Sequence, residues 1–137
     1  FRPKQPPPVA SGPCPSARSR GRMSVKSIRE GEGKAMLQRW LPEFSNGEFK
    51  IDCAGTIVNP DVLTDPKNWS LVLEANPWLK TTKLVAKPDQ MIGGRGKAGL
   101  LAINKDYEEV KKWIVDRMCK DTTVAGITGQ LTHFLIE

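Results

Sequence analysis

The sequence has little histidine and little cysteine, the residues that most often carry nucleophilic and metal chemistry. Its single histidine is His133. Because Ser and Cys nucleophiles usually need an imidazole as their base, one histidine argues against hydrolases of the Ser-His-Asp type and against a His-rich metal site. The three cysteines, Cys14, Cys53 and Cys119, are odd in number and far apart. They predict neither a disulfide framework nor a CxxC zinc site, and they favour a reducing compartment.

Long apolar runs are also absent. No stretch approaches the roughly 20 apolar residues that a membrane-spanning helix needs, so no membrane association is predicted. With 39% hydrophobic residues, including four Trp and four Phe, the 137 residues can still build a core. This length suits one small globular domain and is short for a complete enzyme with several substrates.

The net charge of +6 is concentrated at one end of the chain. Residues 1–22 hold five of the 21 basic residues, none of the 15 acidic ones and six of the 11 prolines, which leaves 16 basic and 15 acidic side chains in residues 23–137. Such a Pro/Arg-rich segment has too little apolar surface to fold, so we expect a disordered tail over residues 1–22. The tail is either upstream sequence read as protein, with Met23 the true start, or a transit peptide to an organelle. The first origin is favoured because the chain opens with Phe1.

Residues 23–137 have the pattern of one packed domain. Ser27 and Glu30 have the spacing of a capping box. The apolar periodicity after them predicts a helix over residues 28–41, and Pro42 is expected to end it.

Two further elements are expected in the middle of the chain. Short apolar pieces at 49–51 and 56–58 predict a strand or an edge hairpin. Asp65 followed by Pro66 is typical of a helix N-cap and first helical position, and Pro77 is expected to close that second, short helix.

The last third of the domain alternates strands with other elements, so the predicted fold class is α/β. Asp106 is expected to cap an amphipathic helix, whereas residues 122–132 are polar and interrupted by glycine and predict no regular element. Because the final strand is only begun at Glu137, the domain looks truncated. Strands are expected at 83–87, 99–103 and, as the start of a strand, 134–136.

The segment densest in chemistry is the glycine loop Gly-Gly-Arg-Gly-Lys at residues 93–97. Glycines let backbone amides approach an anion, and Arg95 and Lys97 add positive charge, so the loop is a plausible phosphate cradle between two strands. It matches neither GxxxxGK[ST] nor GxGxxG, and a flexible basic hairpin turn is the alternative. Lys87 ends the preceding strand and is well placed to meet nucleotide phosphates, unless it is an ordinary strand-end lysine that reaches solvent.

Four other kinds of residue are expected to be structural. Asp89 is interpreted as a turn-capping acid rather than a metal ligand, and no Mg²⁺ site is found. Cys119 follows an apolar stripe and is expected to pack, and His133 is expected at the surface or at the start of a strand. Core packing is the interpretation for the four tryptophans, at positions 40, 69, 78 and 113.

The run LVAKPDQMIGGRGKAGL at residues 84–100 resembles the ATP-grasp nucleotide-binding segment of the ATP-citrate lyase (ATP citrate synthase) family. The similarity extends to MSVK at 23–26, NPWL at 76–79 and GQLTHFLIE at 129–137. It covers most of residues 23–137, least clearly 42–65, and does not include the tail. Several matches in the right order make the resemblance specific.

The resemblance implies the first part of an ATP-grasp amino-terminal domain from an enzyme that uses ATP and CoA to cleave citrate, giving acetyl-CoA, oxaloacetate, ADP and phosphate. It implies ATP-binding roles for Lys87, for Arg95 with Gly96 and, with weaker support, for Lys97. The Mg²⁺ ligands, the phosphorylated histidine and the sites for citrate and CoA would lie outside the chain, so no catalytic residue is assigned and the fragment alone is expected to be inactive. The full enzyme would be a cytoplasmic homotetramer or heteromer.

Three alternatives remain open from the sequence. The beta subunit of succinyl-CoA synthetase also carries a GGRGK-like loop, but the Lys-Pro-Asp-Gln lead-in favours the lyase. A basic nucleic-acid-binding module could use the tail and the 93–97 loop, although the rest of the chain is nearly neutral and no aromatic is interleaved with the loop. An assembly or regulatory role has only the short length of the chain in its favour.

Overall fold

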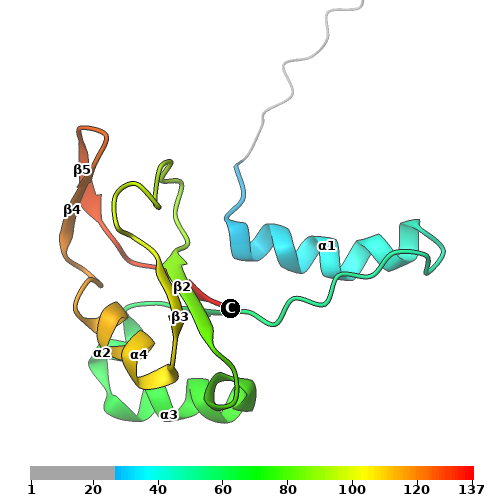
Figure 1. Cartoon of the computed structure of the whole chain (residues 1–137), viewed down its shortest axis with the longest axis horizontal. Coiled ribbons are helices and arrows are strands. Elements are labelled where there is room, and N and C mark those ends of the chain that lie inside the picture. Colours follow the sequence, from blue (N-terminus) through cyan, green and yellow to red (C-terminus); the bar gives the residue numbers. More distant parts are fainter. Residues whose placement is uncertain (1–26) are drawn as a thin grey trace, which may run out of the picture.

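The computed structural model describes residues 27–137. A small sheet with helices packed on one face makes up most of the molecule, and one long helix projects from it (Figure 1). The predicted tail over residues 1–22 and the predicted start of the domain at Met23 lie outside the described residues. Within the described part, no helix is both long and apolar enough to cross a membrane.

The main sheet has four antiparallel strands in the order β1-β6-β2-β3. The two central strands were expected from their apolar runs, and they place residues 87 and 135 directly opposite each other. Along β2, Leu84, Ala86 and Pro88 are buried while Val85 and Lys87 are only partly buried, which is the two-residue alternation of a strand. The strands are β1 (Thr56–Val58), β2 (Leu84–Pro88), β3 (Ala102–Lys105) and β6 (Phe134–Ile136).

The core lies between the sheet and the shorter helices (Figure 1). Trp69 and Leu79 are buried there against sheet residues, and Trp113 meets Phe134 edge-on with ring centroids 5.7 Å apart. Because Leu84 and Ala86 face this core, Lys87 emerges on the opposite face of the sheet. The helical elements are α2 (Asp61–Thr64), α3 (Pro66–Ala75), the 3-10 turn η1 (Pro77–Lys80) and α4 (Tyr107–Val115).

Local caps were predicted correctly for two of these helices. The Asp65 side chain accepts a hydrogen bond from the Lys67 amide at 2.8 Å, so it is the N-cap of α3. Asp106 and Glu109 form a reciprocal capping box at α4, with bonds of 2.9 and 3.2 Å. Pro77 does not itself close α3, which ends at Ala75, but begins η1.

The projecting helix is α1 (Glu30–Phe44), and it differs from the prediction at both ends. Its first turn is capped by the Glu32 carboxylate, which accepts from the Arg29 amide at 3.2 Å, and not by Ser27 with Glu30. The helix also continues through Pro42. A proline near a helix end removes only one amide donor, and the Ser45 amide still bonds the Leu41 carbonyl at 3.0 Å.

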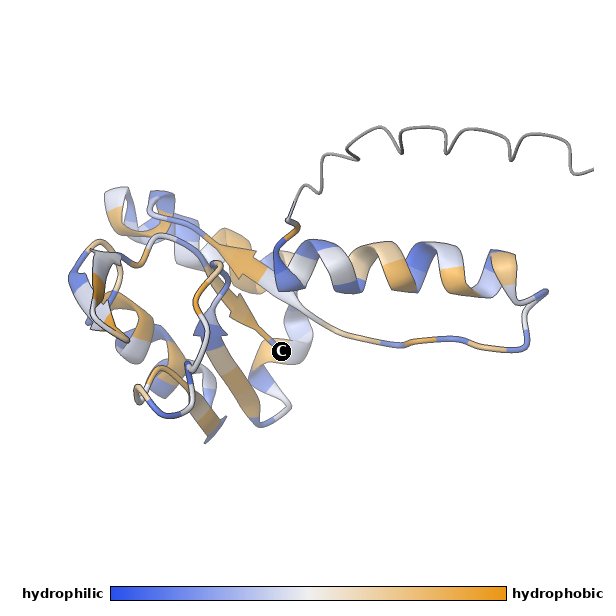
Figure 2. Cartoon of the chain, turned by 90° about the horizontal axis from the view of Figure 1, so that it is seen from above, coloured by the Kyte–Doolittle hydropathy of each residue, from blue (hydrophilic) through white to orange (hydrophobic). Residues whose placement is uncertain are grey.

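No residue of α1 is buried. Seen from above, the helix extends away from the sheet and carries both apolar and polar residues along its length (Figure 2). Trp40 is therefore 37% exposed, and the prediction that it packs in the core is wrong. Its ring contacts neighbours on the same helix, Phe44 at 6.0 Å and the Arg39 guanidinium at 4.7 Å.

A hairpin occupies the stretch for which no element was predicted. Strands β4 (Asp121–Val124) and β5 (Ile127–Gln130) pair antiparallel around Ala125 and Gly126, both of which have positive φ. Two consecutive positive φ values are typical of the tight turns that join twisted hairpin strands. Ala is an unusual residue there, so the turn carried no signal in the sequence.

Two strand boundaries also differ. Residues 49–51 form no strand, and only 56–58 of the predicted hairpin is regular. Strand β3 begins at Ala102 instead of Gly99, because residues 99 and 100 still belong to the turn. The Gly99 and Leu100 amides bond back to the carbonyls of residues 96 and 95.

Candidate functional site

The glycine loop joins β2 to β3, as the sequence predicted, and coils into consecutive turns. The Ala98 amide bonds the Gly94 carbonyl at 3.1 Å, and Gly94 has a φ of 72°, a left-handed conformation that favours glycine. A Cβ added at Gly93 or Gly94 would meet no atom within 4 Å. The space beside the loop is therefore open to a ligand.

Lys87 leaves β2 on the face of the sheet that carries no core, and its side chain is only 13% exposed. Its ammonium group lies 2.6 Å from Glu30 Oε1 and 2.5 Å from Glu137 Oε1. The first carboxylate comes from the first residue of α1 and the second from the residue after β6. Three separate segments thus meet at one lysine.

Arg95 folds back from the loop toward the end of β2. Its Nη1 donates to the Pro88 carbonyl at 2.7 Å, and its Nη2 lies 2.7 Å from Glu30 Oε2. Since the other oxygen of Glu30 binds Lys87, one carboxylate joins the two predicted cations. Gly96 follows Arg95 in the loop, whereas Lys97 is exposed and makes no ion pair within the described range 27–137.

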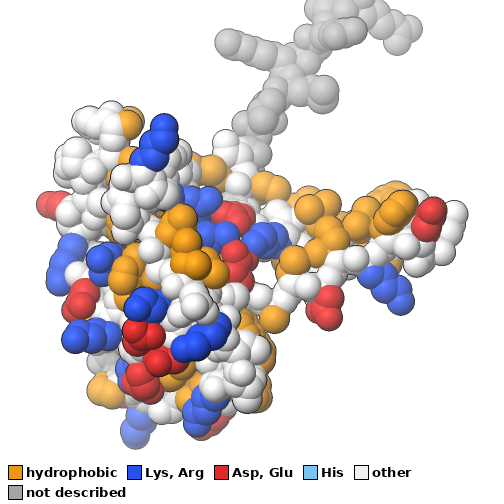
Figure 3. All heavy atoms as spheres, in the orientation of Figure 1, with side chains coloured by type: hydrophobic (Ala, Val, Ile, Leu, Met, Phe, Trp, Pro, Cys, Tyr) orange, Lys and Arg blue, Asp and Glu red, His pale blue; other side chains and the backbone are white. Residues whose placement is uncertain are grey.

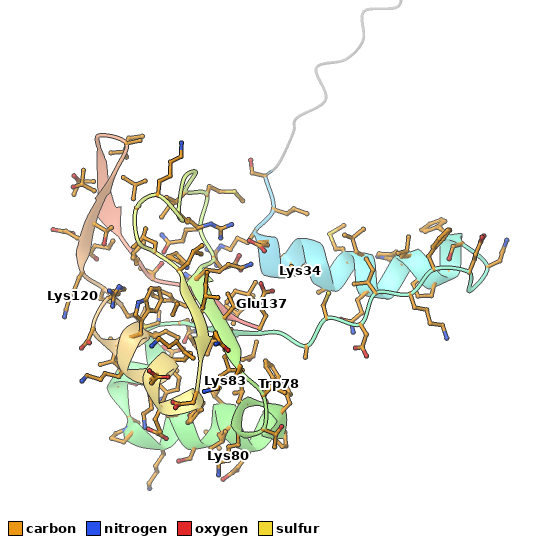
Figure 4. The ribbon with its side chains drawn as sticks, in the orientation of Figure 1. Lys34, Trp78, Lys80, Lys83, Lys120 and Glu137 are labelled. Carbon is orange, nitrogen blue, oxygen red and sulfur yellow. The ribbon has the colours of Figure 1, made fainter. Side chains whose placement is uncertain are left out.

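Lys34 completes the cluster from one turn further along α1. Its ammonium group lies 3.3 Å from Glu30 Oε1 and also pairs with Glu137. Figure 4 shows Lys34 and Glu137 lying side by side at the base of α1, and Figure 3 shows the basic and acidic side chains gathered there. A cavity of about 270 Å³ adjoins the pair and is lined also by Gly31 and Thr56.

The charges shift one another's pKa values. Partial burial raises the pKa of Glu30, but the hydrogen bonds from Lys87 and Arg95 outweigh it and lower this pKa from 4.5 to about 2. Burial likewise raises the pKa of Glu137, and Lys34 and Lys87 bring it below its usual value. Burial opposes the charge on Lys34, but its two carboxylate partners raise its pKa. The two carboxylates are therefore ionised and Lys34 is protonated at neutral pH.

Asp89 is not the local turn cap that the sequence suggested. It is 1% exposed, and its Oδ1 accepts a hydrogen bond at 3.2 Å from the amide of Gly31, in the first turn of α1. Its Oδ2 is buried and has no hydrogen-bond partner among residues 27–137. A carboxylate at the positive end of a helix stabilises it, so Asp89 helps to anchor α1 on the sheet.

Sequence reasoning missed Glu30, Lys34 and Glu137 as members of the site. The i,i+4 spacing of the first two predicts a helical ion pair, but no local signal indicates that it meets Lys87, more than 50 positions away. Glu137 ends the run on which the family resemblance rests, yet its carboxylate was not singled out.

Two other chemically reactive residues lie away from the cluster. His133 directly precedes β6, and its carbonyl accepts a hydrogen bond from the Asp89 amide at 2.8 Å. Cys119 is exposed at a positive φ of 61° in the turn after α4, so the prediction that it packs in the core is wrong. The described residues contain no group of three or more His, Cys, Asp or Glu side chains that could hold a metal ion.

A second cavity, of about 450 Å³, lies between the glycine loop and the β4–β5 hairpin. Met91 and Ile92 line it from the loop side, and Val124 and Ile127 from the hairpin. The glycine loop therefore has the charged cluster on one side and an apolar recess on the other.

An antiparallel sheet in which a strand lysine meets an arginine from the glycine-rich connection is suited to holding the phosphates of a nucleotide. The family model of the ATP-citrate synthase ATP-grasp domain matches residues 24–137, and the chain belongs to this family. This confirms the predicted resemblance and the predicted fold, and it decides against the succinyl-CoA synthetase and nucleic-acid alternatives.

Curated relatives and solved structures that resemble the chain come from the same family. The chain is 41% identical to the probable ATP-citrate synthase subunit 2 of Schizosaccharomyces pombe, in a match that covers 84% of this chain and 28% of that protein. It is 38% identical to human ATP-citrate synthase, over 84% of this chain and 10% of the human one. The structure of ATP citrate lyase from Methanothrix soehngenii in complex with citrate and coenzyme A matches with a TM-score of 0.67 and 43% identity, over 80% of this chain and 25% of that one. The chain therefore spans about a quarter of the yeast and archaeal proteins and a tenth of the human protein.

Proposed function

We propose that the protein containing this sequence cleaves citrate with ATP and CoA, giving acetyl-CoA, oxaloacetate, ADP and phosphate, and that residues 23–137 form part of its ATP site. Membership of the family supports this, as do relatives named ATP-citrate synthase and the archaeal complex with citrate and coenzyme A. This part of the chain would form one wall of the ATP site. Citrate and CoA would bind outside it, so this part would not catalyse the reaction by itself.

The observation that carries the proposal is the meeting of Lys87 and Arg95 on one carboxylate at the glycine loop. A phosphate group, like a carboxylate, offers adjacent oxygens to two cations at once. Phosphoryl transfer asks a protein mainly to position the phosphates and neutralise their charge. In this proposal Lys87 contacts the nucleotide, Arg95 with Gly96 closes over its phosphates, and Lys97 adds positive charge from the exposed part of the loop.

The remaining assignments belong to the whole protein. The tail over residues 1–22 would lie outside the folded domain, and the protein would be cytoplasmic. Its assembly would be a homotetramer or a heteromer, and the yeast relative's name, subunit 2, supports the second. The Mg²⁺ that usually accompanies ATP would be held by residues outside this part of the chain, because the described residues bring together no group of three His, Cys, Asp or Glu side chains.

The activity is tested on the native-length protein purified from cells. Formation of ADP and oxaloacetate that requires citrate, CoA and ATP together supports the proposal, whereas ADP formed with succinate and not with citrate contradicts it. Within the site, Lys87→Met should weaken ATP binding by more than about tenfold, because a charge-assisted bond to a phosphate is lost. Lys83→Met, the same change at an exposed position just before β2, is the matched control and should bind ATP like the wild type.

A further inference from the structure

Glu30 stands at the centre of the charged cluster but belongs to neither the glycine loop nor β2. It is the first residue of α1, and its two carboxylate oxygens are divided between the two candidate phosphate-binding cations. Oε1 lies 2.6 Å from Lys87 Nζ, and Oε2 lies 2.7 Å from Arg95 Nη2. The proposed function assigns this carboxylate no role.

The contacts of Glu30 form a closed network rather than a single surface ion pair. Lys34 also reaches Oε1 of Glu30, and Glu137 pairs with both lysines. Lys34 and Lys87 therefore each have two carboxylate partners, whereas Arg95 has one. Exposed ion pairs contribute little to stability on their own, but networks with partly buried members hold their side chains in place. Lys87, at 13% exposure, is the most buried member.

The carboxylates leave donors free for a ligand. Lys87 has three N–H donors, of which Glu30 and Glu137 occupy two. Arg95 has five, and its bonds to the Pro88 carbonyl and to Glu30 use two. Lys87 and Arg95 can therefore each donate to a phosphate while both stay bonded to Glu30.

Without Glu30, the Pro88 carbonyl would be the only hydrogen-bond partner left to the Arg95 side chain among residues 27–137. It sits in a loop with glycines on both sides, and glycine has more backbone freedom to lose than any other residue. A flexible arginine would have to be ordered when the ligand binds, and that ordering lowers affinity.

We infer that Glu30 is a positioning residue of the ATP site, which fixes Lys87 and Arg95 at one point so that both meet the nucleotide phosphates together. The inference rests on the proposed function. It makes the first turn of α1 part of the ATP site, although α1 carries no residue of the glycine motif.

The test measures ATP binding to the native-length protein by titration calorimetry. Glu30→Gln keeps the shape of the side chain and removes its charge. It should weaken ATP binding about tenfold, or about 1.4 kcal/mol, because Arg95 is no longer ordered by a charged partner before the nucleotide binds. Glu43→Gln, the same change at an exposed position near the other end of α1, is the matched control and should leave ATP binding unchanged.

A double-mutant cycle separates positioning from a general structural role. If Glu30 acts by orienting Arg95, then Glu30→Gln should weaken ATP binding by less than about threefold once Arg95→Met is present, because coupled residues are not additive. Full additivity in the cycle would overturn the inference, as would wild-type or tighter binding by Glu30→Gln. If Lys87→Met and Arg95→Met also bind ATP like the wild type, these residues do not form the proposed ATP site. The proposed activity is tested separately by citrate-dependent formation of ADP.

Discussion

Gly31 in the first turn of α1 has no room for a side chain, so Gly31→Ala should loosen the candidate ATP site. A Cβ at this position would lie 2.8 Å from Ile57 Cδ1 and 3.0 Å from Asp89 Oδ2. The isoleucine is 41% exposed and its methyl end can move aside, but Asp89 is 1% exposed and cannot. The first turn of the helix must therefore shift away from the sheet, and Glu30, its first residue, must shift with it.

The magnitude follows from two opposing effects. Replacing a helical glycine by alanine normally stabilises the helix by about 1 kcal/mol. Here the shift breaks the bond from the Gly31 amide to the Asp89 carboxylate, and a hydrogen bond to a charged group contributes about 1.5–3 kcal/mol. The docking of α1 should lose about 0.5–2 kcal/mol, which weakens ATP binding by up to roughly 2- to 30-fold.

Gly33→Ala is the matched control on the same helix. A Cβ there would meet only the Ile28 side chain, at 3.4 Å from Cδ1 and 4.0 Å from Cγ1, so this variant should gain helix stability and bind ATP like the wild type. The assays are calorimetric ATP titration and hydrogen exchange of the amides in the first turn of α1. If Gly31→Ala binds ATP as tightly as Gly33→Ala and shows no faster exchange, the docking of α1 does not hold the site together.

Three further predictions concern single residues. The folded-state pKa of Glu30, about 2, lies below its usual 4.5, so its stabilising contribution is complete above pH 4.5 and is lost as the pH falls toward 2. An NMR titration of its carboxyl carbon should give a midpoint near 2, and a midpoint near 4.5 would show that the ion pairs do not form. Asp106→Ala removes the N-cap of α4 and should lower the free energy of unfolding by about 1 kcal/mol in denaturant titrations; Asp106→Asn, a good capping residue, should lose much less. Ala125→Gly relieves the φ of 51° in the β4–β5 turn and should stabilise the hairpin by about 1 kcal/mol, seen as slower hydrogen exchange of its amides, whereas unchanged exchange would contradict the strained turn.

The elements that the sequence predicted well are those whose signals are local. Asp65 and Asp106 cap helices through bonds to residues two and three positions away, and both were correctly assigned. The strands at 84–88 and 134–136 are short apolar runs at the centre of the sheet. Every residue of the second is buried, and alternate residues of the first are.

The elements that were missed depend on context that the sequence does not display. The β4–β5 hairpin turns at Ala125, a residue that rarely adopts a positive φ. The helix α1 continues through Pro42 because a proline in the last turn removes only one amide donor. Trp40 is exposed because the polar contacts that hold α1 on the sheet lie near its start, at Glu30, Gly31 and Lys34.

The residues of the candidate site also fall into those that the sequence indicated and those that it did not. Lys87 and Arg95 lie within one contiguous motif, so residue chemistry and the family resemblance both drew attention to them. Glu30 and Asp89 depend on a contact between α1 and the end of β2, and the distance along the chain hides it. The sequence therefore drew attention to Lys87 and Arg95 but not to Lys34, Glu30 or Glu137.

The most direct measurement is a structure of the native-length protein with a non-hydrolysable ATP analogue. The account predicts phosphate oxygens within about 2.7–3.2 Å of Lys87 Nζ and of the Arg95 guanidinium, with Glu30 still bound to both. Phosphates bound away from the glycine loop, with Lys87 and Arg95 paired only to Glu30 and Glu137, would contradict it.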